Sequence, residues 1–165
     1  WQNYLDGGAD DDPSRHSERP VYEYACKIIQ RRYDRIMKKG HAIGPTSPDE
    51  DLHRLRIQCK KLRYSLEFFA SLFPEKKISQ VIKQLKQLQD NLGDFNDLSV
   101  QQDMLQEYLS TIKPGSKKKL RLAAAIGGLL TNLHHEQNDV RARFVGTFGK
   151  FSGSKNTKLF TQLFG

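Results

Sequence analysis

The sequence has few of the features that support disulfide chemistry, membrane insertion or catalysis. It contains only two cysteines, Cys26 and Cys59, with no CxxC pair, and each falls on the apolar side of a predicted helix. Buried thiols in a reducing compartment are therefore favoured over redox or metal chemistry. No apolar run approaches the ~20 residues that span a bilayer, and no signal-peptide pattern, P-loop or activated nucleophile is present. We expect a soluble, cytoplasmic protein that is not an enzyme and uses no metal or cofactor.

Strands are also not expected, because no segment alternates between apolar and polar residues and β-branched residues are sparse. Apolar residues instead recur at helical spacing between breaks at Gly40, Pro74, Gly93 and Pro114. Ser47 before Pro48 is expected to cap the second helix. The pattern predicts an all-α antiparallel helical bundle in one domain, with helices over residues 21–39, 48–73, 76–92, 94–112 and 117–151.

The two ends of the chain differ from this helical region. Residues 1–19 carry two glycines, a run of Asp and Pro13, and the chain begins without Met. We interpret them as a linker or the tail of a missing upstream half. Residues 20–151 form the expected bundle, and residues 152–165 are a C-terminal tail that is too polar and Gly-rich to assign.

Acidic residues are scarce in most of the chain. The 27 bases and 19 acids give a net charge of +8, but six acids and only two bases lie in residues 1–23. That leaves 25 bases against 13 acids, a net charge of +12, from Tyr24 onward. Such a positive field attracts polyanions: nucleic acid, acidic lipid surfaces or phosphate polymers.

The charge is concentrated on one side of the helix that contains LHRLRIQCKKLRY, residues 52–64. At about 100° per residue, Arg56, Lys60, Arg63 and Tyr64 lie within roughly 80° of His53. Glu67 is the only acid between Asp51 and Glu75. A solvated helix face usually mixes charges of both signs, so this face is predicted to bind anions.

The preceding predicted helix carries a second basic row. Its members share a side about 80° wide and are Lys27, Arg31, Arg35 and Lys38. Two basic helices offer spaced cations on rigid supports, which suits a phosphate polymer that has no bases to stack. Nucleic-acid binders interleave aromatic side chains, and only Tyr64 does so here. Polyphosphate is therefore favoured, with a nucleic-acid-associated helical protein as the alternative.

The segment LHRLRIQCKKLRYSLEFF, followed about 20 residues later by LQDNLGDFNDLSV, closely resembles the repeat of the CHAD domain, the conserved histidine α-helical domain. The resemblance covers roughly Pro20 to Phe151 and is strongest to the second of the two repeats that family members usually contain. It implies binding of inorganic polyphosphate in a cationic channel between two bundles, in some proteins on polyphosphate granules. By position it implies site residues His53, Arg56, Lys60, Lys61, Arg63 and Tyr64, together with Arg31 and Arg35 of the preceding helix.

Only one copy of the repeat is present, so half of that channel is not accounted for. We expect the exposed half to pair with the missing upstream repeat or with a second copy as a homodimer, because an unpaired half would expose apolar surface beside like charges. A helical assembly or scaffold module is a further alternative. A monomeric mass by light scattering in moderate salt would contradict dimerisation.

Some polar residues have competing interpretations. For His53, a phosphate donor whose charge rises as the pH falls through about 6.5 competes evenly with an imidazole that fixes helix packing. His134, His135 and Glu136 do not form an HExxH motif and are expected to be structural or solvent-facing. Asp94 or Asn96 is expected to cap a helix after Gly93. Gly127 and Gly128 indicate either close helix contact or a kink.

Overall fold

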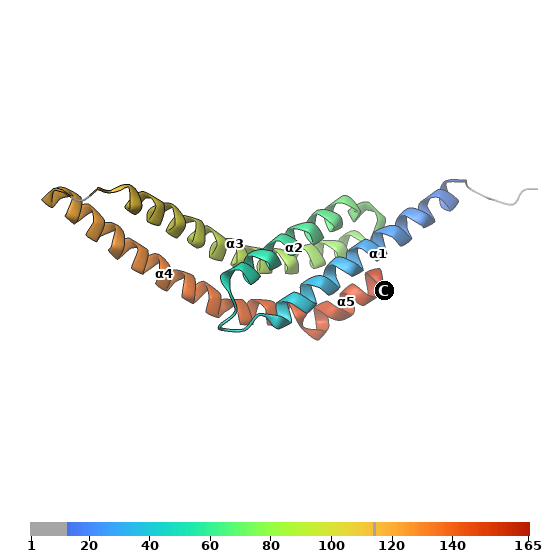
Figure 1. Cartoon of the computed structure of the whole chain (residues 1–165). Helices are drawn as coiled ribbons and strands as arrows, with labels where there is room; N and C mark the ends of the chain where they lie inside the picture. The colour runs from blue at the N-terminus through green and yellow to red at the C-terminus, as the bar shows by residue number, and fades with distance from the viewer. Residues whose placement is uncertain (1–12, 114) are drawn as a thin grey trace, which may run out of the picture.

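The computed structural model describes residues 13–113 and 115–165, and this part of the chain consists of helices without strands (Figure 1). Helix α1 packs beside α2, α2 beside α3 and α3 beside α4, while α5 contacts α1, α3 and α4. The predicted all-α helical bundle is confirmed. The elements are α1 (Pro13–Ala42), α2 (Asp49–Phe68), the 3-10 helix η1 (Ala70–Leu72), α3 (Glu75–Thr111), α4 (Lys117–Ser152) and α5 (Ser154–Phe164).

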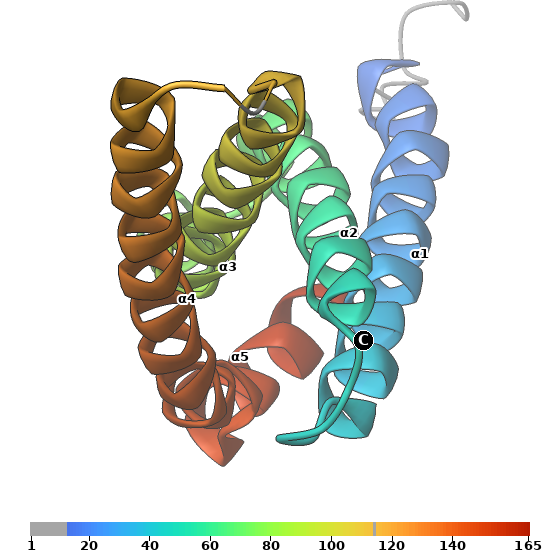
Figure 2. The ribbon, with the colours of Figure 1, turned by 60° about the vertical axis from the view of Figure 1, so that its left-hand side comes forward.

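Helices α3 and α4 are the longest helices in the described part of the chain, at 37 and 36 residues, and they pack against each other. The end of this pair that carries their connecting turn extends away from α1 and α5 (Figure 1). We call this extension, residues 100–113 and 115–130, the arm. Figure 2 shows α1 and α2 side by side, with α5 beneath the bundle.

The predicted helix boundaries at Pro20, Gly40 and Gly93 were wrong. Helix α1 begins at Pro13 and contains Pro20, and it continues through Gly40 to Ala42. Helix α3 is continuous through Gly93. The buried residues Leu88, Leu92 and Phe95 keep their helical spacing across that glycine, so their burial offsets the helix cost of about 1 kcal/mol that a glycine carries.

The cap of α2 differs from the prediction, and the C-terminal tail, which the sequence left unassigned, is helical. Helix α2 begins at Asp49 without a side-chain cap, and the Ser47 hydroxyl instead accepts a hydrogen bond from the Gly44 N–H at 2.9 Å. The tail forms α5, whose Phe160, Leu163 and Phe164 are buried. These apolar residues at positions i, i+3 and i+4 place one face of α5 in the core.

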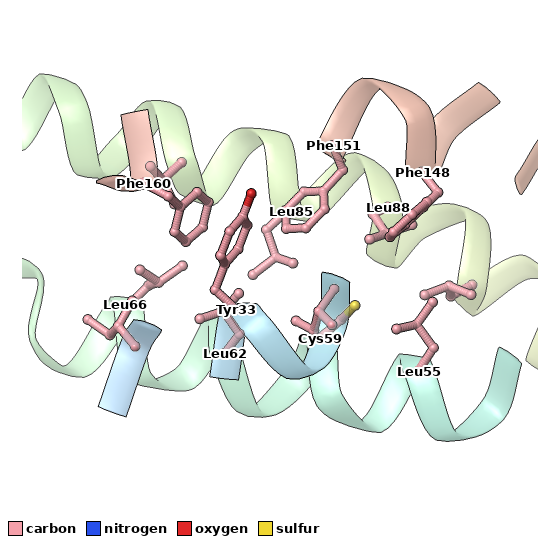
Figure 3. Packing of buried hydrophobic residues seen from close by; sticks show 14 of the residues in the cluster. Tyr33, Leu55, Cys59, Leu62, Leu66, Leu85, Leu88, Phe148, Phe151 and Phe160 are labelled. Atoms are coloured by element: carbon pink, nitrogen blue, oxygen red, sulfur yellow. The ribbon is translucent and has the colours of Figure 1, made fainter. Parts of the chain in front are cut away.

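The core joins all five α-helices (Figure 3). Tyr33 of α1 stacks on Phe160 of α5 with ring centroids 3.9 Å apart, and its hydroxyl lies 3.2 Å from the Thr157 hydroxyl. Phe151 of α4 packs against both aromatic rings. The C-terminal helix therefore closes the side of the bundle on which α1 would otherwise expose apolar surface.

The two thiols have different environments. Cys59 is fully buried in the core, and burial raises its pKa to about 12, whereas Cys26 is partly buried.

Because the thiolate is the reactive form, we expect a thiol reagent at pH 8 to label Cys26 slowly and Cys59 only after unfolding. Between roughly pH 8.5 and 12 the unfolded chain ionises Cys59 and the native chain does not, so stability falls as the pH rises through this range. Rapid labelling of both thiols in native buffer would contradict this.

Candidate functional site

Helices α1 and α2 are joined at the centre of the two predicted basic rows. The guanidinium of Arg32 on α1 donates to the Lys61 carbonyl and the Ser65 hydroxyl on α2. The Ser65 hydroxyl in turn donates to the Lys61 carbonyl at 3.0 Å. Hydrogen bonds from a charged donor contribute more than neutral ones, so this contact fixes one helix against the other. We call the line along which α1 and α2 meet the seam.

The cations of the α1 row differ in how close they lie to the seam. All four are exposed. At about 100° per residue, Arg35 and Arg31 lie within roughly 60° and 100° of Arg32, and so border the seam. Lys27 and Lys38 lie further round the helix, and both Lys27 and Arg31 line a groove with Phe164 of α5.

The predicted residues of α2 divide between its two flanks. Lys61 is exposed, and its backbone carbonyl accepts a hydrogen bond from Arg32, so it lies on the flank of α2 that faces α1. Arg56 and Arg63 are half-buried, and the ion pair with Glu67, with a smaller contribution from Asp90 of α3, raises the pKa of Arg63. Spacing of seven residues puts Arg56 in line with Arg63 and His53 in line with Lys60. These four lie toward α3, with the exposed Tyr64 between the two flanks.

The structure provides a packing partner for His53. Its Nδ1 lies 2.9 Å from Oδ1 of Asn96 on α3, so the imidazole links α2 to α3. The surrounding groove is lined by the carboxylates of Asp49, Glu50 and Asp103. Asp49 and Glu50 are paired with Arg141 and Arg54, so the contact with Asn96 is the observation that favours the packing hypothesis for His53.

We expect His53→Ala and Asn96→Ala each to lower the free energy of unfolding by about 0.5–1 kcal/mol, because each removes one exposed side-chain hydrogen bond. The double variant should cost less than the sum of the single variants. Denaturant unfolding measures all three values. Polyanion affinity between pH 8 and 6 should keep the wild-type profile in His53→Ala. A loss of affinity in His53→Ala that is absent from Asn96→Ala would instead make the imidazole a ligand group.

Three arginines with structural contacts, Arg32, Arg54 and Arg141, were not among the predicted site residues. Arg54 pairs with Glu50 on its own helix at 3.1 Å. Arg141 of α4 pairs with Asp49 at 2.5 Å and donates to the Ser47 carbonyl, which holds the loop before α2 against α4. The helical period could have placed Arg32 at the edge of the apolar stripe, but the contact of Arg141 is long-range and has no local signal.

The remaining predicted clusters have structural positions. His134, His135 and Glu136 are exposed on α4. Asp94 and Asn96 lie inside α3 and cap no helix, so the capping prediction was wrong. Within residues 13–113 and 115–165, no group of three or more His, Cys, Asp or Glu side chains is placed to hold a metal ion. None of the helices in the described part of the chain is long and apolar enough to cross a membrane.

Comparison with known proteins identifies the family. The family model of the CHAD domain matches residues 1–106, which include α1, α2, the two basic rows on these helices and most of α3. The match begins before Pro20 and ends within α3, so it covers a different span from the one expected from the two motifs. The comparison with curated proteins gives no match. Because the matched region is well over half of the 165 residues, the chain belongs to the CHAD domain family.

Proposed function

We propose that this chain binds inorganic polyphosphate, without catalysis, along the seam between α1 and α2. The observation that carries the proposal is the Arg32 contact, which holds two cationic helices side by side. Among the described basic residues of these two helices, Arg54 pairs with Glu50 and Arg63 pairs with Glu67. Arg31, Arg35 and Lys61 are therefore available to an added anion, as is Lys60 on the flank toward α3.

The chemistry of the seam suits a phosphate chain. Polyphosphate presents a negative charge at each unit, so it gains most from cations at intervals on a rigid support. Arginine offers a planar fork to two phosphate oxygens, and lysine offers a compact charge. The Arg32 hydrogen bonds preorganise both helices, which reduces the conformational entropy lost on binding.

Family membership supports the same ligand. CHAD domains are known in general to bind polyphosphate, and the CHAD fold is a helical binding domain and not a recognised catalytic fold. We further propose that the protein is cytoplasmic and is located on polyphosphate granules where these are present. The seam residues would contact the ligand. The other predicted cations, Lys27, Lys38, Arg56 and Arg63, would attract it at longer range.

A specific observation keeps nucleic acid as the second candidate. Tyr64 and Phe68 have 56% and 79% of their surface exposed, and their spacing of four residues places them on one side of α2. Aromatic side chains beside cations can stack the bases of a single strand. The ligand is therefore best decided by competition and not by salt dependence, since both polyanions bind less tightly as salt rises.

The test is displacement of fluorescent long-chain polyphosphate by unlabelled polyphosphate or by single-stranded RNA at matched phosphate concentration. We expect RNA to require at least ~10-fold more phosphate, because it places fewer charges along the same length of seam. Phe68→Ala, at an exposed residue outside the predicted polyphosphate site, serves as the matched variant and should leave polyphosphate binding unchanged. Equal displacement by RNA that is lost in this variant would overturn the proposal in favour of nucleic acid.

A further inference from the structure

The arm exposes apolar side chains on one side. Met104 and Tyr108 of α3 have 65% and 53% of their surface exposed, and Leu122 and Leu129 of α4 have 41% and 47%. The four come from two helices that pack against each other. A monomeric bundle gains nothing from placing such residues in water.

The groove at the base of the hairpin shows that these four residues share one side of it. That groove is lined by Asp97 and Gln101 of α3 and by Glu136 of α4. A step of seven residues turns a helix by only about 20°. On α3, Met104 is therefore in line with Asp97, and Tyr108 is in line with Gln101. On α4, Leu129 and Leu122 are in line with Glu136. The exposed apolar patch is the continuation of the groove toward the tip of the arm.

Charge changes sign along this side. The groove at the base carries Asp94, Asp97, Glu136 and Asp139, with Arg143 as its one basic lining residue. At the tip, the exposed Lys118 lies within about 40° of Leu122 and Leu129, while Lys117, Lys119 and Arg121 point further round α4. The side therefore reads acidic, apolar and basic from base to tip. A surface with this order is complementary to itself when a second copy is turned end to end.

The middle of α4 contains two glycines that the chain's own packing does not explain. A Cβ at Gly127 or Gly128 would meet no atom within 4 Å, and the helix is continuous through both. Each costs about 1 kcal/mol of helix stability relative to alanine. At about 100° per residue, Gly127 and Gly128 lie roughly 160° and 100° from Leu129, so both are outside the apolar patch and a partner on the patch would not cover them.

We propose that the arm is a homodimer interface, in which a second copy packs antiparallel along the apolar patch about a two-fold axis near Gly127. Residue 127 is midway between Lys118 and Glu136, each about 14 Å away along the helix at 1.5 Å per residue. The same axis lies within about two residues of the midpoint of Leu122 and Leu129. Two-fold packing therefore places apolar patch on apolar patch and Lys118 opposite Glu136 of the partner.

Sedimentation velocity of the 165-residue chain over a wide concentration range tests this surface. We expect a dimer whose dissociation constant rises at least 10-fold in Leu129→Glu. The matched control is Val145→Glu, which adds the same charge at an apolar residue of α4 that is 64% exposed and outside the arm. Circular dichroism confirms that both exposed-site variants remain folded.

Charge reversal tests the antiparallel arrangement. Lys118→Glu and Glu136→Lys should each weaken the dimer, and the double variant should restore it toward the wild-type dissociation constant. A chain that stays monomeric at all concentrations overturns the proposal, as does a dimer that Leu129→Glu does not weaken. Failure of the double variant to restore the dimer overturns the antiparallel packing. None of these outcomes depends on polyphosphate binding.

Discussion

Replacing Gly40 by valine is expected to lower the free energy of unfolding by about 3 kcal/mol, the upper range for overpacking a core. Gly40 is a buried residue in the last turn of α1, and a Cβ there would overlap the ring of Phe148 on α4. That ring is itself almost fully buried, so it has little room to move. Chemical denaturation monitored by circular dichroism measures the change.

Two comparisons isolate this contact. Gly93→Ala inserts a methyl group where nothing lies within 4 Å, so it should stabilise α3 by about 0.5–1 kcal/mol. Phe148→Ala should cost about 3–5 kcal/mol alone and much less in the Gly40→Val background, because the two side chains compete for one space. A Gly40→Val protein within 0.5 kcal/mol of wild type would show that the ring is free to shift.

These two glycines show where sequence reasoning stops. Both interrupt an apolar helical pattern, and a break was predicted at each. Helix α3 continues through Gly93 because Leu92 and Phe95 on either side are buried in register, and α1 continues for two exposed residues beyond Gly40. Gly40 is needed for the approach of Phe148, which lies more than 100 residues away, whereas a Cβ at Gly93 would meet no atom within 4 Å. Local pattern cannot separate these cases, since the difference is in the partner.

The candidate site has the same limit. The period of each helix was sufficient to predict that Arg31, Arg35, Lys60 and Lys61 lie on polar surfaces, because a helix face is a local property. Which neighbour borders each flank is decided by tertiary packing. His53 therefore shared a predicted face with Lys60, yet its partner is Asn96 on α3 and its neighbours are acids. Arg32 was overlooked for the converse reason, since its role depends on α2.

Removing two seam cations together, Arg35→Ala/Lys61→Ala, is expected to weaken polyphosphate binding by roughly 100-fold, at about 1.5 kcal/mol for each charge-assisted contact. Titration calorimetry with long-chain polyphosphate measures the change. The matched control is Lys117→Ala/Lys119→Ala, which removes the same two charges from exposed positions at the tip of the arm. It alters only the long-range field, which salt screens over about 10 Å, so its effect should stay within about 3-fold.

A third pair locates the ligand on α2. Arg56→Ala/Lys60→Ala removes two cations from the flank toward α3, where Glu67 already pairs with Arg63 at 2.6 Å. If the polymer follows the seam, this pair should matter less than Arg35→Ala/Lys61→Ala. The reverse order would place the ligand between α2 and α3 and would return His53 to the site. Equal, small losses of affinity from all three double variants would mean that polyphosphate binding depends only on net charge. Each double variant removes two positive charges, so a ligand bound to one defined surface should lose more affinity when the charges on that surface are removed.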